Sequence, residues 1–287
     1  MLLLAAVSTG CSNVTHKTKS AQDKPHREAR ASKGRGYDVY LLIGQSNMAG
    51  RAGMQADDTT RTMQGVWLLN GDDVPEPARN PLNRYSTVRK DKNPNVYSNQ
   101  KINPGTAFGE TVAAATGRKV LLVVNAMGET SIEEWAKTAP VIGLSSSIGK
   151  GRLQLYSEAV RRCKEAMKYG KLKAIIWHQG EGNSNRVEEY PAQLAQFVSD
   201  LREDLGAPDV PFIAGELSYT RGKGSDEFNA MIRTISTFVD NSDWVSADGV
   251  SAGKDRTHFD RAGQLELGKR YADKVLEMCY PAKKSKK

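Results

Sequence analysis

A serine and a histidine 212 positions apart carry the clearest chemistry in this sequence. Ser46 lies in the run GQSNMAG (44–50), directly after the apolar run Val39–Ile43. His258 ends the run DRTH (255–258), in which a carboxylate precedes the imidazole by three positions. A serine at a strand end, with a carboxylate and an imidazole late in the chain, is the raw material of Ser-His-Asp nucleophilic catalysis.

Two histidines are candidates for the catalytic base. The chain has four, and His16 and His26 lie in a polar N-terminal segment, which leaves His178 and His258. The side chain of Asp255 can reach the Nδ1 atom of His258 across one turn of backbone, where it would fix the tautomer and stabilise the imidazolium. His178 follows an apolar run, where a structural role in the core is equally consistent with its position.

The remaining polar signals are weaker one by one. Ser46 in a tight turn into a helix would place backbone N–H groups near a developing oxyanion, although serine also serves as an ordinary helix N-cap. Gln179 offers a side-chain amide donor at a strand end, and Gly128 offers an unobstructed backbone N–H. Ser46, Gly128 and Gln179 are therefore candidate donors for an oxyanion hole.

Apolar runs alternate with segments of helical period from Tyr37 onward, which favours a mostly parallel sheet covered by helices on both faces. In such sheets, ligands bind at the carboxyl ends of the strands, where the loops with Ser46, Gly128 and Gln179 begin. The expected strands are Val39–Ile43, Val66–Leu69, Lys119–Val124, Lys173–Trp177, Pro211–Leu217 and a sixth candidate, Trp244–Ala247. The expected helices are Ala107–Thr116, Gly151–Tyr169, Glu188–Leu205, Ser225–Val239 and Arg261–Met278.

The net charge of +8 belongs to the ends of the chain. Residues 12–36 hold a surplus of five basic groups and residues 281–287 hold four lysines, which leaves −1 for residues 37–280. A nucleic-acid-binding protein carries its basic charge on a folded face or a recognisable motif, and this sequence shows neither. We therefore expect no nucleic acid partner.

The first 11 residues, MLLLAAVSTGC, resemble the apolar part of an export signal that ends at Cys11. The run is too short for a transmembrane helix, so we expect an exported protein that is periplasmic, secreted or, if Cys11 is lipidated, anchored to a bacterial cell surface. Residues 12–36 read as a flexible basic tether, and residues 281–287 as a basic tail. Cys163 and Cys279 fall in expected helices, and export would permit a disulfide between them, but we interpret them as two buried free thiols.

Four ordered blocks resemble the sialate O-acetylesterase and family-six carbohydrate esterase group of SGNH-type serine hydrolases. They are GQSNMAGR (44–51), MGETSIEEW (127–135), WHQGEGN (177–183) and DRTHFDRAGQLELGKRYA (255–272). The resemblance covers residues 37–280 and implies one esterase domain. It also implies a flavodoxin-like, three-layer α/β/α fold with a mostly parallel five-stranded sheet.

The resemblance also implies roles for individual residues. Ser46 would be the nucleophile and His258 the general base and acid, with Asp255 orienting His258 and with no metal or organic cofactor. The backbone N–H groups of Ser46 and Gly128, with the side chain of Gln179, would form the oxyanion hole. Glu181, in the HQGE run, is an alternative triad acid. The family usually has a second glycine where this chain has Glu129, whose charge is expected to point away from the oxyanion.

The implied activity is removal of O-acetyl groups from sugars. Acetylated xylan or its oligosaccharides is the leading substrate expectation, and O-acetylated sialic acid is the alternative within the same class. A non-catalytic carbohydrate-binding protein on the same fold is the alternative from another class. Specificity is expected to depend on surface loops such as residues 71–100.

Overall fold

A computed structural model of the chain describes residues 36–86, 101–140, 142–143 and 152–281. The predicted export signal with Cys11, the tether up to residue 35, the tail beyond residue 281 and residues 87–100 of the predicted specificity loop lie outside the described residues. In the described part of the chain, no helix combines the length and apolarity needed to cross a membrane.

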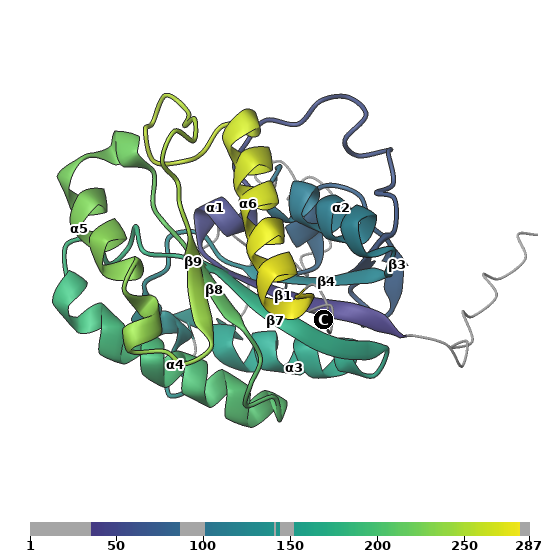
Figure 1. Ribbon diagram of the computed structural model, residues 1–287, viewed down its shortest axis with the longest axis horizontal. Helices are drawn as coiled ribbons and strands as arrows, with labels where there is room; N and C mark the ends of the chain where they lie inside the picture. Colours follow the sequence, from purple (N-terminus) through teal and green to yellow (C-terminus); the bar gives the residue numbers. More distant parts are fainter. Residues whose placement is uncertain (1–35, 87–100, 141, 144–151, 282–287) are drawn as a thin grey trace, which may run out of the picture.

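A seven-stranded sheet forms the centre of the fold, in the order β3-β2-β4-β1-β7-β8-β9 (Figure 1). Every neighbouring pair is parallel except β2 and β3, which pair antiparallel. The strands are β1 (Tyr37–Gly44), β2 (Val66–Leu69), β3 (Pro75–Pro77), β4 (Val120–Ala126), β7 (Gly170–His178), β8 (Phe212–Gly215) and β9 (Ser242–Val245). Two short strands, β5 (Ile142–Gly143) and β6 (Arg152–Leu153), form a separate antiparallel pair.

The predicted five-stranded sheet is wrong in its number of strands. The sequence Pro-Glu-Pro of β3 lacks the alternating or apolar pattern of a strand, yet proline is tolerated where one edge of a strand needs no backbone donor. β9 begins two residues before the sixth candidate, Trp244–Ala247, because the polar residues Ser242 and Asp243 hide its start. Strand β3 and the start of β9 both lie at edges of the sheet, where fewer side chains are buried and the apolar pattern is therefore weakest.

Helices cover both faces of the sheet, as predicted. Successive residues of β1 point to opposite faces: Tyr40 and Leu42 pack under α2 and α6, and Val39 and Leu41 pack over α3, α4 and α5. Figure 1 shows α2 and α6 on one side of the strands and α3 and α4 on the other. The helices are α1 (Ser46–Ala49), α2 (Gly105–Thr116), α3 (Leu155–Met167), α4 (Tyr190–Leu205), α5 (Lys223–Ile232) and α6 (Arg261–Cys279). Short 3₁₀ turns are η1 (Leu82–Tyr85), η4 (Ile132–Trp135), η5 (Val187–Glu189), η6 (Tyr219–Arg221) and η7 (Ile235–Thr237).

The helix predicted over Ser225–Val239 ends early. α5 stops at Ile232, and only the 3₁₀ turn η7 follows. The Thr234 and Thr237 hydroxyls each donate to the carbonyl oxygen three residues earlier, at 2.7 Å. Such local bonds compete with the regular helical pattern, which explains the break.

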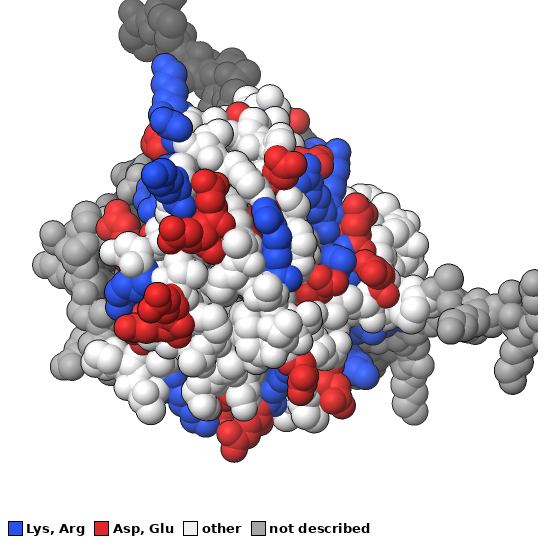
Figure 2. Space-filling model, turned by 60° about the vertical axis from the view of Figure 1, so that its left-hand side comes forward, with Lys and Arg blue, Asp and Glu red and all other residues white. Residues whose placement is uncertain are grey.

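The cysteines and the surface charges can be compared with the sequence-based expectations. Both cysteines are free thiols, as expected, but only Cys163 is buried, and Cys279 is half-buried. The face shown in Figure 2 carries acidic and basic side chains next to one another and no continuous basic surface. Charge on this face is therefore mixed in sign.

Candidate active site

The three loops predicted to carry chemistry leave neighbouring strands at one edge of the sheet. β4, β1 and β7 lie side by side, and their carboxyl ends lead to Gly128, Ser46 and Gln179, respectively. Gly44, the last residue of β1, has a φ of 136°, and a Cβ there would lie 2.2 Å from the carbonyl oxygen of His178. Only glycine permits this close approach, so the turn into Ser46 depends on it.

Ser46, His258 and Asp255 form a continuous chain of hydrogen bonds. The Nε2 atom of His258 lies 2.8 Å from the Ser46 Oγ atom, and its Nδ1 atom lies 2.7 Å from Asp255 Oδ2. A carboxylate at Nδ1 favours the tautomer with its proton on Nδ1, so that Nε2 accepts the serine proton. The structure thus brings together the three residues that the sequence predicted as nucleophile, base and acid.

Asp255 is held by its own loop. Its Oδ1 atom accepts the backbone N–H groups of Thr257, at 3.0 Å, and His258, at 2.9 Å. Partial burial opposes ionisation, but the hydrogen bonds from the His258 ring and from these two amides outweigh it and lower the pKa of Asp255 to about 2. The carboxylate is therefore ionised throughout the pH range in which a histidine base works.

Glu181, the alternative acid, sits differently. Its side chain is buried, its Oε1 atom accepts from Asn47 Nδ2 at 2.6 Å, and no hydrogen bond joins it to His258 in the described residues. Burial raises the pKa of Glu181 above its usual value, against the smaller lowering effects of the Asn47 bond and nearby positive charge. Glu181 therefore holds Asn47, which also donates to the carbonyl oxygen of Thr257, but it makes no hydrogen bond with His258 among the described residues.

His178 belongs to the core. The ring is fully buried, its Nδ1 atom lies 2.8 Å from the hydroxyl of Tyr271, and burial lowers the pKa of His178 to about 4. The buried ring of His178 stays neutral and does not contact Ser46. Of the two candidate bases, only His258 reaches the serine.

Gly128, the second predicted backbone donor, lies beside Ser46. A Cβ on Gly128 would be 3.5 Å from the Cβ of Ser46, and neither N–H has an acceptor in the described part of the chain. Two free N–H groups next to a serine hydroxyl can receive a negatively charged oxygen. Glu129, the next residue, is exposed with a φ of 64°, a left-handed conformation that glycine adopts without strain.

Gln179 is buried, and its side-chain amide already has partners. Its Nε2 atom has three acceptors within hydrogen-bond distance, Gln45 Oε1 at 3.0 Å, Asn183 Oδ1 at 2.8 Å and Thr130 O at 3.1 Å. Its Oε1 atom accepts from the hydroxyl of Tyr190 at 2.7 Å. Because an amide nitrogen has two hydrogens, Gln179 reaches an oxyanion only if it releases one of these acceptors.

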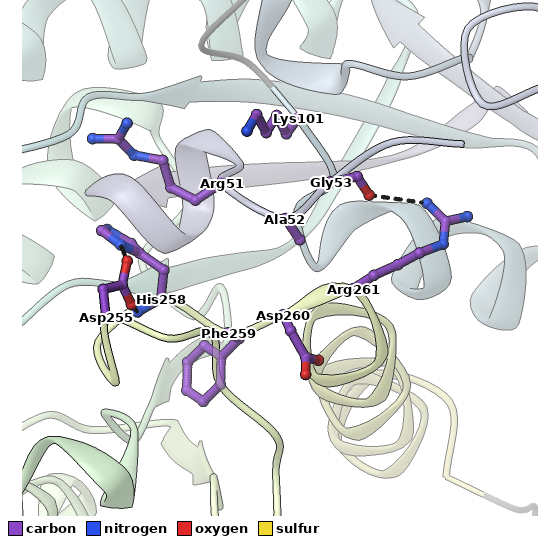
Figure 3. Close-up of a pocket in the computed structure, with 10 residues that line it drawn as sticks. Arg51, Ala52, Gly53, Lys101, Asp255, His258, Phe259, Asp260 and Arg261 are labelled. Atoms are coloured by element: carbon purple, nitrogen blue, oxygen red, sulfur yellow. Dashed lines mark hydrogen bonds and ion pairs between the residues drawn. The ribbon is translucent and has the colours of Figure 1, made fainter. Parts of the chain in front are cut away.

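A cleft of about 420 Å³ opens beside the Asp255–His258 pair (Figure 3). Its wall includes Arg51 and Lys101 in addition to the two catalytic candidates. His258 is therefore open to a ligand from this side. Among the described residues, no cluster of three or more His, Cys, Asp or Glu side chains is arranged to hold a metal ion.

Comparison with known proteins shows the family of the chain. The model of the family described as "Carbohydrate esterase, sialic acid-specific acetylesterase" matches residues 36–277. The chain belongs to this family. A probable carbohydrate esterase of Arabidopsis thaliana is 27% identical over 256 residues, which are 83% of this chain and 90% of the plant protein.

Solved structures share the fold of this family member. The crystal structure of the same Arabidopsis protein has a TM-score of 0.70 at 25% identity, covering 84% of this chain and 98% of that one. NanS has a TM-score of 0.60 at 16% identity, covering 84% of this chain and 97% of that one. A carbohydrate acetylesterase from Xanthomonas citri has the same TM-score and identity, covering 85% of this chain and 57% of that one. At 16% identity, the last two show the fold alone.

Sequence reasoning assigned no role to one buried polar residue of this esterase-family site. Asn47 donates to Glu181 and, at 3.2 Å, to the carbonyl oxygen of Thr257. Its Oδ1 atom accepts from Phe259 N and from Gln264 Nε2, both at 3.1 Å. Its position directly after Ser46 was the available signal, but its partners come from loops that the sequence places far away.

Proposed function

We propose that this chain is a carbohydrate O-acetylesterase that works through Ser46, His258 and Asp255. The hydrogen bond between His258 Nε2 and Ser46 Oγ, at 2.8 Å, carries the proposal, because it joins a hydroxyl to a base that a carboxylate orients. Family membership supports an acetyl ester of a sugar as the substrate class.

The reaction follows from this geometry in two halves. Ser46 Oγ attacks the acetyl carbonyl carbon while His258 Nε2 takes the serine proton. The oxyanion forms beside the backbone N–H groups of Ser46 and Gly128. As the tetrahedral intermediate collapses, His258 gives the proton to the sugar oxygen, and the sugar leaves as an alcohol with the acetyl group on Ser46.

Water completes the cycle. His258 removes a proton from a water molecule that attacks the acetyl-enzyme, and the second tetrahedral intermediate collapses to acetate and free Ser46, to which His258 returns the proton. Asp255 remains ionised and stabilises the imidazolium in both halves. No step needs a cofactor.

Acetate release measures the activity directly. Wild type and Ser46→Ala are compared on acetylated xylan, on O-acetylated sialic acid and on a small chromogenic acetyl ester. We expect wild type to release acetate far above the rate of Ser46→Ala on at least one of them, with equal thermal stability of the two proteins. Equal background rates on all three would refute the esterase and favour the non-catalytic binding protein.

Two further parts of the sequence-based interpretation stay proposals. Acetylated xylan and O-acetylated sialic acid are both acetyl esters of sugars, and the catalytic atoms alone do not rank them. Export, with Cys11 as a lipid anchor, is tested by mass spectrometry of the mature N-terminus after expression in a bacterial host. An unprocessed Met1 in the membrane-free fraction would contradict it.

A further inference from the structure

The cleft beside His258 is lined by two cations that have no acidic partner among the described residues. They are Arg51 and Lys101, both half-buried, and no ion pair or hydrogen bond of either side chain occurs in the described part of the chain. In Figure 3 both side chains point away from Arg261, toward the side of the cleft that holds His258.

The other charged groups of the cleft are committed elsewhere. Asp255 binds the His258 ring, and Arg261 pairs with Asp58, whose Oδ1 atom accepts from its guanidinium at 2.9 Å. Asp260 caps the N-terminus of α6. The two negative charges and the third positive charge of the wall therefore do not neutralise Arg51 or Lys101.

Backbone pairing fixes the positions of the two cations. The segments that follow them meet in an antiparallel bridge between Ala52 and Ile102, in which Ile102 N donates to Ala52 O at 3.0 Å. At Gly50, a Cβ would lie 2.4 Å from the carbonyl oxygen of Lys101. The chains that carry Arg51 and Lys101 are thus in direct contact, and their charges cannot easily separate.

Arg51 also lies close to the reacting atoms. Its Nη2 atom is 3.6 Å from the point where a Cβ on Gly128 would sit, and that point is 3.5 Å from Ser46 Cβ. An anion held by Arg51 would therefore be separated by no more than the width of one sugar ring from an acetyl group that Ser46 attacks.

We propose that Arg51 and Lys101 form a subsite for the carboxylate of an acidic, O-acetylated sugar. This inference rests on the proposed esterase function and names its substrate class. A guanidinium matches a carboxylate through two parallel hydrogen bonds, and an ammonium adds a point charge. A neutral acetylated xylose residue would remove water from both cations and give them no partner, which opposes its binding.

Uronic acids and nonulosonic acids both supply this carboxylate, and the experiment separates them. The specificity constant kcat/KM is measured for an O-acetylated galacturonate and for an O-acetylated sialic acid, each against its own methyl ester. The methyl ester keeps the sugar and the acetyl group and removes only the negative charge. We expect wild type to prefer the acid over its methyl ester by at least about tenfold in one pair, the value of one charge-assisted hydrogen bond.

The variants test whether the two cations cause the preference. In Arg51→Gln/Lys101→Gln, the ratio of acid to methyl ester should fall to near one, and either single change should give an intermediate ratio. Lys171→Gln is the matched control, since it removes one exposed positive charge at the amino end of β7, across the sheet from the cleft. Because each ratio is taken within one protein, a general loss of rate cancels.

Two results would overturn the subsite. One is a wild-type ratio near one in both pairs, and the other is an unchanged ratio in the double variant. If wild type hydrolyses none of the esters, the proposed function fails, and calorimetric binding of each deacetylated acid against its methyl ester still tests the subsite. If wild type binds the free acid more tightly than its methyl ester and the double variant does not, this result would support the subsite without the esterase function.

Discussion

Replacing Asp255 by asparagine should slow acetyl-ester hydrolysis more than replacing it by alanine. Asp255 Oδ1 accepts two backbone N–H groups, so the amide oxygen of an asparagine must take that place. The amide nitrogen then faces His258 Nδ1 as a donor. This bond selects the tautomer with its proton on Nε2, which cannot accept the proton of Ser46.

The magnitude follows from charge and exposure. With charge centres ~4 Å apart, a carboxylate stabilises an imidazolium by about 4 kcal/mol at an effective dielectric constant of about 20. Because 55% of the Asp255 side chain is exposed, solvent reduces this to about 2 kcal/mol. The alanine variant should therefore lose roughly 30-fold in kcat, and the asparagine variant up to about 10⁴-fold, since the wrong tautomer adds to the lost charge.

The assay is kcat on a chromogenic acetyl ester at pH 8, with thermal melting as the check on folding. Glu181→Gln is the matched comparison, because the amide oxygen keeps the bond from Asn47 and the buried carboxyl is already disposed toward its neutral form. We expect its kcat to stay within about threefold of wild type, as for loss of one outlying interaction. Asp248→Asn, at an exposed acid outside the cleft, controls for a change of surface charge.

Two outcomes would refute this reasoning. A crippled Glu181→Gln together with a mild Asp255→Asn would make Glu181 the triad acid. An asparagine variant faster than the alanine variant would show that the loop rotates the amide and that backbone donation to Oδ1 does not fix its direction.

Three more outcomes can be measured. Burial lowers the pKa of His178 to about 4, so below pH 6.5 the unfolded chain takes up a proton at this residue while the folded chain does not. The free energy of unfolding should therefore fall by about 3 kcal/mol between pH 6.5 and 4. Denaturant titrations of His178→Gln should show a decrease that is smaller by this amount. Glu129→Gly relieves a left-handed residue and should raise the unfolding free energy by up to about 1 kcal/mol, and a decrease would contradict this. In Asn47→Asp, the hydrogen bond to Glu181 is replaced by two carboxyl groups that face each other, and they repel once both are ionised. The kcat of this variant relative to wild type should therefore fall as pH rises. Adding Glu181→Gln should restore part of the loss by supplying a new donor, and no recovery would contradict the importance of the bond.

The predicted site depended on short-range patterns that survive without tertiary information. Asp255 and His258 are three residues apart, so their mutual reach is nearly a local property. The pairing of His258 with Ser46 instead depends on tertiary structure, and it was predicted from the residue types and the family resemblance and not from the pattern of strands and helices. Gln179 was assigned from its type and place, but its amide nitrogen donates to the side chains of Gln45 and Asn183 and to the carbonyl oxygen of Thr130. No local pattern reveals such competition.

The same limit applies to the sheet and to the cleft. Central strands such as β1 and β4 are buried on both faces and announce themselves as apolar runs, whereas the edge strand β3 has no such requirement. Unpaired charge is also invisible in a sequence: Arg51 and Arg261 look alike until Asp58 is found beside only one of them. Fold class follows from the pattern of apolar residues, but the ion pairs of a cleft follow only from the folded structure.

The residues on either side of Ser46 explain why the nucleophile is held so closely. Gln45 Oε1 accepts from Gln179 Nε2 at 3.0 Å and lies 3.3 Å from the donors Gly180 N and Gly182 N, which ties the serine turn to the loop after β7. Asn47, through its bonds to Thr257 and Phe259, ties the same turn to the loop that carries His258. Asn47 donates through its Nδ2 atom and accepts through its Oδ1 atom, and an ionised carboxylate in the same place would only accept. The serine therefore stands between two buried anchors, and the 2.8 Å contact with its base is set before any substrate arrives.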